Sequence, residues 1–255
     1  MRMQQAIAAV IEQQLAIPVV IEDYPGRPAG CELLCARADW AELGQQAALQ
    51  LQRLNPVKKW SVEQASQMAE EPLLLGALLT SLGVVDGAVA GAVATTPDVI
   101  RAGLRGVGLA ANSGLVSSSF LMQHPNWVMS FGDCGVNPDP NSDQLAQIAI
   151  DTARSHQLLT GQTPKIALLS FSTLGSASHP SVDKVREATA LVKTMAAAID
   201  PAWQVSGEVQ ADVALVATVA ALKAPNEAIA GDANVLIFPD LSAGNIGYKL
   251  VERLA

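Results

Sequence analysis

Apolar residues recur along this chain at two periods, one typical of helices and one typical of strands. Ile7, Val10 and Ile11 share one face of a helix predicted over residues 4–16. Other helices are predicted at 41–54, from Ser61 (in a capping box with Gln64), from Pro72 to a C-cap at Gly83, from about Pro97, from Asn141 (capped with Gln144) to about His156, from Ser181 to Ala198, and from the last loop to Ala255.

Apolar runs between these helices predict strands. In chain order they are PVVIED (18–23), DGAVAGAV (86–93), WVMSF (127–131), KIALLSF (165–171), WQVSGEVQAD (203–212) and NVLIF (234–238). Helices and strands alternate almost throughout, which indicates a layered α/β fold with mostly parallel sheets and flanking helices. We expect two α/β domains, residues 1–110 and 111–255, joined in an ordinary loop near Ala110–Gly114.

Composition narrows the range of partners. Half of the residues are hydrophobic but only 4% are aromatic, as in helices packed closely on a buried sheet. The net charge of -8 argues against nucleic acid, although one Arg and a few N–H groups suffice for a small anion. No apolar run approaches the ~18–20 residues of a membrane span, and no signal peptide is evident. Three cysteines favour free thiols. We therefore expect a cytoplasmic globular protein.

Ligands of such folds bind beyond the carboxyl ends of strands, where loops and helix N-termini meet. Four predicted strand ends run into loops rich in Gly, Ser, Thr, Asn or Asp. These are GAVATTPDVIR (91–101), FGDCGVNPDPN (131–141), SFSTLGSASHPS (170–181) and FPDLSAGNIGYK (238–249).

The first of these loops has the features of an anion site. Thr95 and Thr96 stand where a helix N-cap belongs, and Pro97 stands where a missing N–H costs nothing. Arg101 follows one turn later on the same face, and helical side chains lean toward the N-terminus. Two hydroxyls, free N–H groups and a fork-shaped cation suit phosphate. Ordinary capping beside a solvated Arg explains the same residues.

The loop after KIALLSF is rich in hydroxyl groups. Ser170, Ser172, Thr173 and Ser176 surround Gly175, which suits phosphate or a cofactor. The same residue types also make plain loops, so both interpretations stay open.

The two remaining loops are weaker candidates. Asp133 beside Cys134 raises the possibility of a thiol nucleophile, but no His lies nearby in sequence, and a structural Cys is favoured. In the last loop, Asn245 follows a glycine that allows close backbone approach, and Tyr248 and Lys249 open the final helix. Lys249 either holds a phosphate or is an ordinary surface Lys.

Several familiar signals are absent from the sequence. GVGLAA (106–111) matches a dinucleotide fingerprint as a string, but it follows a helix instead of a strand. There is no Walker-A loop and no G-x-S-x-G elbow. The three histidines have no metal-ligand spacing, so no metal site is expected.

The order and spacing of the four loops resemble those of the phosphate acetyltransferases, also called phosphotransacetylases. The matching segments are GALLTSLGVVDGAVAGAVATTPDVIRAGL, VSSSFLM, DCGVNPDPNSDQLAQIAI, KIALLSFSTLGSA, DKVREAT, GEVQADVAL and ANVLIFPDLSAGNIGYKLVERL. The phosphate butyryltransferases share this layout but fit DCGVNP and LLSFST less well. A resemblance over most of the chain is far more specific than any single loop.

The resemblance implies a two-domain fold like that of isocitrate and isopropylmalate dehydrogenases, with the active site between the domains of a homodimer. The implied reaction is reversible acetyl transfer between coenzyme A and inorganic phosphate, through direct attack of the thiolate on acetyl phosphate. Coenzyme A is then a substrate and no cofactor is bound. The positions carried over by motif are Arg101 as the catalytic residue, Thr95 and Thr96 beside it, and Ser172, Thr173, Gly175, Asn245, Tyr248 and Lys249 as substrate-binding residues.

The chain departs from the family pattern in three places. A first strand with a Leu-Pro-Glu-Gly-like turn has no counterpart, so the first domain is expected to be incomplete. A second family Arg falls on Asn55, and Arg53 is nearby but out of register. A tail with a Ser-Arg-Gly-Cys-Ser-like motif and a following Asp has no match either. We therefore expect weak or no activity from this chain alone.

Three functions follow from the sequence, in order of preference. The first is a phosphate acetyltransferase, or a related phosphate butyryltransferase. The second is a non-catalytic module that binds acyl phosphate or coenzyme A. The third, an NAD-linked dehydrogenase, depends on fold analogy alone.

Overall fold

The computed structural model describes residues 2–111 and 113–254. Contacts along the backbone divide the chain into two compact units, Met1–Leu109 and Ala110–Ala255, and each is described by itself. Residue 112, inside the predicted domain boundary, and Ala255, the predicted end of the last helix, lie outside the described residues.

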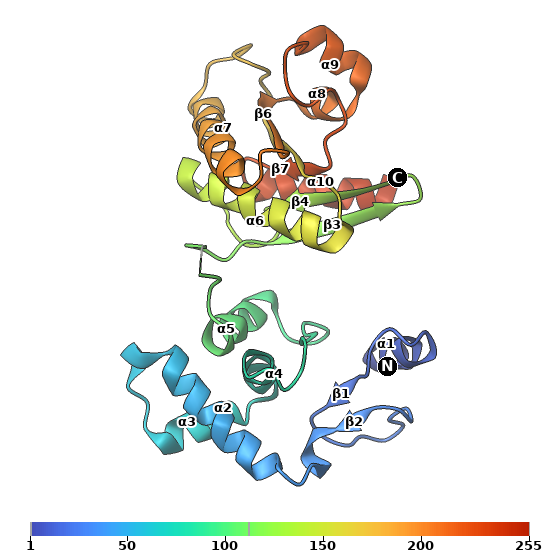
Figure 1. Ribbon diagram of the computed structural model, residues 1–255, viewed down its shortest axis with the longest axis vertical. Coiled ribbons are helices and arrows are strands. Elements are labelled where there is room, and N and C mark those ends of the chain that lie inside the picture. The colour runs from blue at the N-terminus through green and yellow to red at the C-terminus, as the bar shows by residue number, and fades with distance from the viewer. Residues whose placement is uncertain (1, 112, 255) are drawn as a thin grey trace. The chain divides into compact units, whose positions relative to one another are not determined.

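Unit 1 consists mainly of helices (Figure 1). The helices are α1 (Arg2–Glu12), α2 (Trp40–Leu54), α3 (Val62–Ala69), α4 (Pro72–Ser81) and α5 (Thr96–Gly106), with 3-10 turns η1 (Leu34–Ala36) and η2 (Pro56–Lys58). Strands β1 (Val19–Val20) and β2 (Glu32–Leu33) pair in parallel. Buried Leu and Ala side chains of α2, α3 and α4, among them Leu51, Ala65 and Leu78, form the core.

The strand predicted at residues 86–93 is wrong. This segment is an irregular connection between α4 and α5, and Val89 and Val93 are 87% and 97% exposed. Small residues offer little side-chain volume to bury, and glycine weakens a strand. Within the described part of unit 1, only β1 and β2 pair as strands, so this run joins no sheet.

Unit 2 is built around a five-stranded sheet of order β3-β4-β7-β5-β6. The strands are β3 (Ser119–His124), β4 (Trp127–Gly132), β5 (Lys165–Leu169), β6 (Gln204–Val209) and β7 (Val235–Ile237). Strands β4, β7, β5 and β6 run parallel, and β3 pairs antiparallel with β4 through a tight hairpin. The helices are α6 (Ser142–Thr160), α7 (Pro180–Ile199), α8 (Ala211–Leu215), α9 (Ala217–Lys223) and α10 (Leu241–Leu254).

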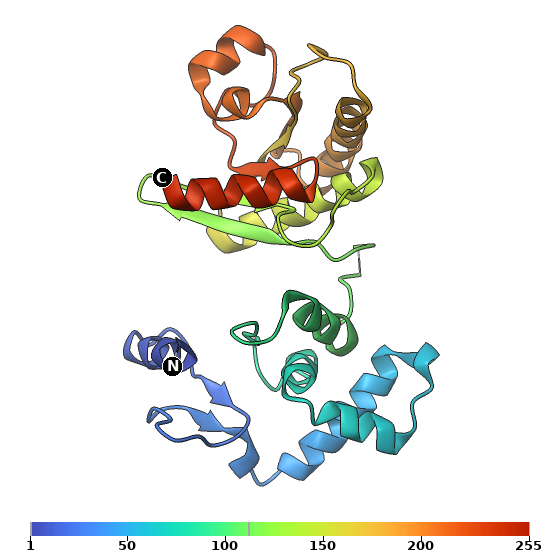
Figure 2. The ribbon, with the colours of Figure 1, turned by 180° about the vertical axis from the view of Figure 1, so that it is seen from behind.

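Alternate side chains of the central strands pack into two separate hydrophobic cores, one on each face of the sheet. Ile166 and Leu168 of β5 pack with α6 and α7, whereas Ala167 and Leu169 pack with α8, α9 and α10. Figures 1 and 2 show the result from opposite sides, with α6 and α10 on opposite faces of the sheet. Burial on both faces explains the unbroken apolar run of KIALL. The predicted α/β fold with a mainly parallel sheet and flanking helices is confirmed.

The capped helix starts agree with the local signals in the sequence, whereas α10 begins at Leu241, earlier than the predicted start at Tyr248 and Lys249. Ser61 and Gln64 form the predicted capping box of α3, and Asn141 and Gln144 form that of α6. The predicted end of α6 at His156 is wrong, because the helix continues to Thr160. It ends at Gly161, whose φ of 70° suits a glycine after a helix C-terminus.

Candidate active site

The carboxyl ends of β4, β7, β5 and β6 lie along one edge of the unit 2 sheet, because these strands are parallel. Three of the four predicted loops leave the sheet at this edge, after β4, β5 and β7. The fourth, residues 91–101, belongs to unit 1. The edge therefore combines most of the predicted binding residues of unit 2.

Asp133 organises the loop after β4. Its buried carboxylate accepts hydrogen bonds from the backbone N of Gly135 (3.0 Å), Val136 (3.2 Å) and Asn137 (2.9 Å), and from the Ser118 hydroxyl. Burial alone would raise the pKa of Asp133, but the hydrogen bonds outweigh this effect and hold it below the ordinary value. A carboxylate so well satisfied is a poor general base.

Cys134 is a structural residue. Its side chain is fully buried, and burial together with the adjacent Asp133 charge raises the pKa of the thiol to about 12. Because the thiolate is the nucleophilic form, the side chain is inert near neutral pH. This finding agrees with the interpretation favoured from the sequence.

The start of α10 packs directly on the Asp133 loop. A Cβ at Gly244 would lie only 2.5 Å from the backbone O of Asp133, so only glycine fits there. Asn245, predicted to lie near the substrate, donates from Nδ2 to the backbone O of Cys134 at 3.2 Å. Its amide group thus ties the first turns of α10 to the loop after β4.

Tyr248 and Lys249 take different positions on α10. The Tyr248 ring stacks on Phe120 of β3, with 4.3 Å between centroids. Lys249 is exposed, with its Nζ 5.8 Å from the centroid of the Tyr248 ring. Within the described residues Lys249 forms no salt bridge, so its charge is available to an anion.

Ser172 and Thr173 are buried in the loop after β5. The Ser172 hydroxyl donates to Glu208 at 3.0 Å and accepts from the backbone N of Ala177 at 3.1 Å. The Thr173 hydroxyl accepts from the backbone N of Gln210 at 3.1 Å. Both side chains therefore shape the loop from within.

Glu208 is the residue of this edge that the site prediction missed. It is a buried carboxylate within the otherwise apolar end of β6, paired with Arg186 of α7. Burial would raise the pKa of Glu208, but Arg186, the Gly175 N–H and Ser172 lower it below the ordinary value. An isolated acid in a strand with two buried faces was the signal available in the sequence.

The predicted anion site of unit 1 contains an acidic side chain. Thr95 is the N-cap of α5, and its hydroxyl accepts from the backbone N of Asp98. Arg101 does reach back to the first turn, as predicted, but it ends on Asp98, with 2.6 Å between Nη1 and Oδ1. Thr96 is the exposed first residue of the helix. A phosphate at this turn would have to compete with the carboxylate of Asp98.

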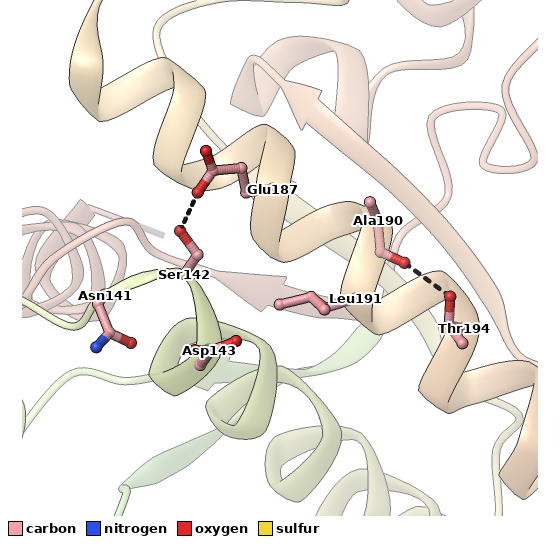
Figure 3. Close-up of a pocket in the computed structure, with 7 residues that line it drawn as sticks. All are labelled: Asn141, Ser142, Asp143, Glu187, Ala190, Leu191 and Thr194. Carbon is pink, nitrogen blue, oxygen red and sulfur yellow. Dashed lines mark hydrogen bonds between the residues drawn. The ribbon is translucent and has the colours of Figure 1, made fainter.

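A surface groove lies beside the N-terminus of α6 and runs along α7 (Figure 3). Its lining residues are Asn141, Ser142, Asp143, Glu187, Ala190, Leu191 and Thr194, none of which is a predicted site residue. Ser142 donates to Glu187 at 2.6 Å across it. Two acidic side chains and a satisfied capping box make this groove unsuited to an anionic substrate.

Two features are absent from the described residues. No helix among them has both the length and the apolar character that crossing a membrane requires. Nor do three or more His, Cys, Asp or Glu side chains among them converge as metal ligands.

Comparison with known proteins places this arrangement in a family. The family model described as phosphate acetyl/butaryl transferase matches residues 1–255. The chain belongs to this family. The phosphate acetyltransferase of Thermoanaerobacterium thermosaccharolyticum is 47% identical over 201 residues, which cover 76% of this chain and 60% of that protein. That of Clostridium acetobutylicum is 45% identical over 204 residues, covering 78% and 60%.

Solved structures with this fold carry related names. The EutD phosphotransacetylase from Staphylococcus aureus is 35% identical, with a TM-score of 0.79 over 97% of this chain and 70% of that chain. A phosphotransacetylase from Streptococcus pyogenes is 33% identical, with a TM-score of 0.81 over 98% and 77%. This member of the phosphate acetyl/butaryl transferase family spans about 60% of the length of the first two curated relatives.

Proposed function

We propose that the protein is a phosphate acetyltransferase, which transfers an acetyl group reversibly between coenzyme A and inorganic phosphate. The observation that carries this proposal is the family match over residues 1–255, joined by relatives named phosphate acetyltransferase at 45–47% identity. The substrates are acetyl phosphate, phosphate and coenzyme A, and no cofactor has to remain bound.

The reaction requires an anion site and a way to hold two anionic reactants in line. We assign the phosphoryl group to Arg101, with Thr95 and Thr96 at the same helix start. Lys249 is a second exposed cation, at the carboxyl edge of unit 2. Ser172, Thr173, Gly175, Asn245 and Tyr248 are the other proposed substrate-side residues.

We further propose the two-domain organisation of isocitrate and isopropylmalate dehydrogenases, with residues of both units serving one reaction. A homodimer in the cytoplasm completes the proposal. In support of the homodimer, Ile246 and Leu250 lie one turn apart on α10 and are 59% and 54% exposed. Contiguous exposed apolar side chains of this kind are typical of protein interfaces.

A non-catalytic module that binds acyl phosphate or coenzyme A is the second candidate. The observation that favours it concerns the two buried carboxylates at the carboxyl edge. Asp133 and Glu208 are both saturated with hydrogen bonds, and the pKa of each lies below the ordinary value. Neither is suited to take the proton from a thiol.

One assay separates these functions. Purified protein is mixed with acetyl phosphate and coenzyme A, and thioester formation is followed by ultraviolet absorbance, with butyryl phosphate as a parallel substrate. Turnover with acetyl phosphate supports the proposal, whereas preference for butyryl phosphate assigns a butyryltransferase. If calorimetry shows that coenzyme A binds but the assay shows no turnover, the result supports the non-catalytic module. If the protein shows no binding of coenzyme A and no turnover, both candidates are refuted.

A further inference from the structure

Glu208 makes an unusual set of contacts for a buried residue near the end of a strand. Its side chain is only 1% exposed, yet it accepts hydrogen bonds from the Ser172 hydroxyl (3.0 Å) and from the backbone N of Gly175 (2.7 Å). Its backbone O accepts from the backbone N of Leu174 at 3.0 Å. Glu208 thus accepts three hydrogen bonds from the loop that follows β5.

The loop held in this way has a costly backbone conformation. Leu174 and Gly175 have φ values of 48° and 86°, two consecutive residues in the left-handed region. Glycine adopts this region freely, but for leucine it is rare and persists only when the surroundings impose it. The two backbone N–H groups that donate to Glu208 are those of these two residues. Leu174 is also 46% exposed, so burial of its side chain does not hold it there.

Arg186 keeps the Glu208 side chain ionised and fixed. Its Nε and Nη2 lie 3.2 Å from the two carboxylate oxygens, a bidentate pair. Nη1 of the same guanidinium donates to Asp183 at 2.9 Å. Asp183 thus contacts Arg186, Arg186 contacts the buried Glu208, and Glu208 contacts the loop after β5. An ionised carboxylate accepts more strongly from an N–H group than a neutral carboxyl does.

We propose that Glu208 is a positioning residue for acyl transfer, which holds residues 172–177 in the left-handed turn that presents this loop to the substrate. The inference rests on the proposed function, because it takes Thr173 and Gly175 as substrate-side residues. Glu208 itself is buried behind the loop and acts through it.

The test combines a local and a functional measurement on Glu208→Gln. Amide hydrogen exchange by NMR reports on Leu174 and Gly175, and calorimetry gives the affinities for coenzyme A and acetyl phosphate. Glu208→Gln places an amide donor against Arg186, so we expect exchange at Gly175, which donates to the side chain, to accelerate by about tenfold or more. Exchange at Leu174, which donates to the retained backbone O, should accelerate less, and both affinities should fall by about fivefold or more. Asp183→Asn, which removes only the outer partner of Arg186, is the matched control and should leave both readouts nearly unchanged.

A second substitution distinguishes positioning from general stability. Leu174→Gly removes the cost of the left-handed conformation, so in the Glu208→Gln background it should restore part of the lost affinity. Leu174→Ala also shortens the side chain but keeps the cost, and should restore none. A purely structural role of Glu208 predicts no such difference. Should Glu208→Gln fail to fold, Arg186→Gln is measured instead, with the same direction of change expected.

The proposal is overturned if exchange at Leu174 and Gly175 is unchanged in Glu208→Gln and in Arg186→Gln. Faster exchange with undiminished affinity overturns it as well, while the proposed function stands. If the unmodified protein binds neither coenzyme A nor acetyl phosphate, the proposed function fails, and the exchange rates still decide whether Glu208 holds the loop.

Discussion

Nη1 of Arg101 lies 2.6 Å from Oδ1 of Asp98 in the first turn of α5. The other oxygen of this carboxylate accepts from the Thr95 hydroxyl at 2.6 Å. Hydrogen bonds from Thr95 and Arg101 hold the pKa of Asp98 below its ordinary value, so it is ionised at neutral pH. The protein therefore places its own anion where the sequence predicts a bound phosphate.

Replacing Asp98 with Asn should strengthen anion binding. The change removes the competing negative charge and leaves Arg101 free to turn to phosphate. We expect affinity for acetyl phosphate to rise by roughly two- to fivefold, as for release of one exposed ion pair. Isothermal titration calorimetry measures this, with Asp143→Asn in the first turn of α6 as control. A weaker affinity would show that Asp98 supports the site.

Replacing Arg101 with Ala should weaken binding of the same ligand by roughly ten- to hundredfold, the range of a charge-assisted contact. Arg105→Ala, which removes a positive charge one turn later in α5, is the matched control. It should change the affinity by less than about twofold. Equal losses in the two variants would mean that the helix acts through its net charge and that Arg101 contacts no ligand.

Local signals in the sequence were sufficient for the helix starts and for the central strands. A capping box such as Asn141 and Gln144 satisfies backbone groups within one turn, so it needs no tertiary context. The run KIALL is apolar throughout because both faces of β5 are covered. In each case the physical cause lies within a few residues of the pattern.

Signals that depend on distant partners were missed or misread. Strand β3 has only three consecutive apolar residues, Phe120–Met122, and it is established by pairing with β4. Residues 86–93 have a strand-like pattern but join no sheet among the described residues. At the site, Glu208 acquires its role from Arg186 and from the loop after β5, contacts that sequence spacing does not reveal. Asp98 was overlooked for another reason, because its i,i+3 spacing to Arg101 within one helix could have paired the two residues from the sequence.

Cys134 should resist alkylation in the folded protein. With a pKa of about 12, only about one thiol in ten thousand is ionised at pH 8. Cys35 is exposed. We expect iodoacetamide to modify Cys35 at least about a hundredfold faster than Cys134, as followed by peptide mass spectrometry. In urea the two rates should converge. Equal rates in the native state would contradict the structural assignment of Cys134.

Gly244→Ala should destabilise unit 2. The added Cβ would lie 2.5 Å from the backbone O of Asp133 and 3.0 Å from Sγ of Cys134, and neither can move freely. Overpacking of this kind costs roughly 1–3 kcal/mol of unfolding free energy. Gly103→Ala in α5 meets no atom within 4 Å and should instead stabilise its helix by about 0.5–1 kcal/mol. Urea denaturation measures both, and a neutral Gly244→Ala would mean that the two loops separate easily.

His156 should make the stability of the protein depend on pH in the mildly acidic range. Its side chain is fully buried in α6, with Nδ1 3.0 Å from the Ser130 hydroxyl. Burial lowers the pKa of His156, and a weaker contribution from Gln162 opposes this shift.

The sign of the effect follows from where the proton binds. Below about pH 6.5 the unfolded chain takes up a proton on this His, whereas the folded protein does not until its lower pKa is reached. The stabilisation is therefore complete above about pH 6.5 and is lost as the pH falls, by at most about 1.4 kcal/mol per pH unit. Asp133 and Glu208 lose their stabilisation only below about pH 4, so the two ranges can be separated.

Urea denaturation between pH 7 and pH 5 tests this on the unmodified protein and on His156→Gln. The variant keeps a polar side chain but cannot titrate, so its unfolding free energy should change less over this range. If His156→Gln keeps the slope of the unmodified protein over this range, the buried Ser130–His156 pair is not its source, and protonation of other groups destabilises the fold.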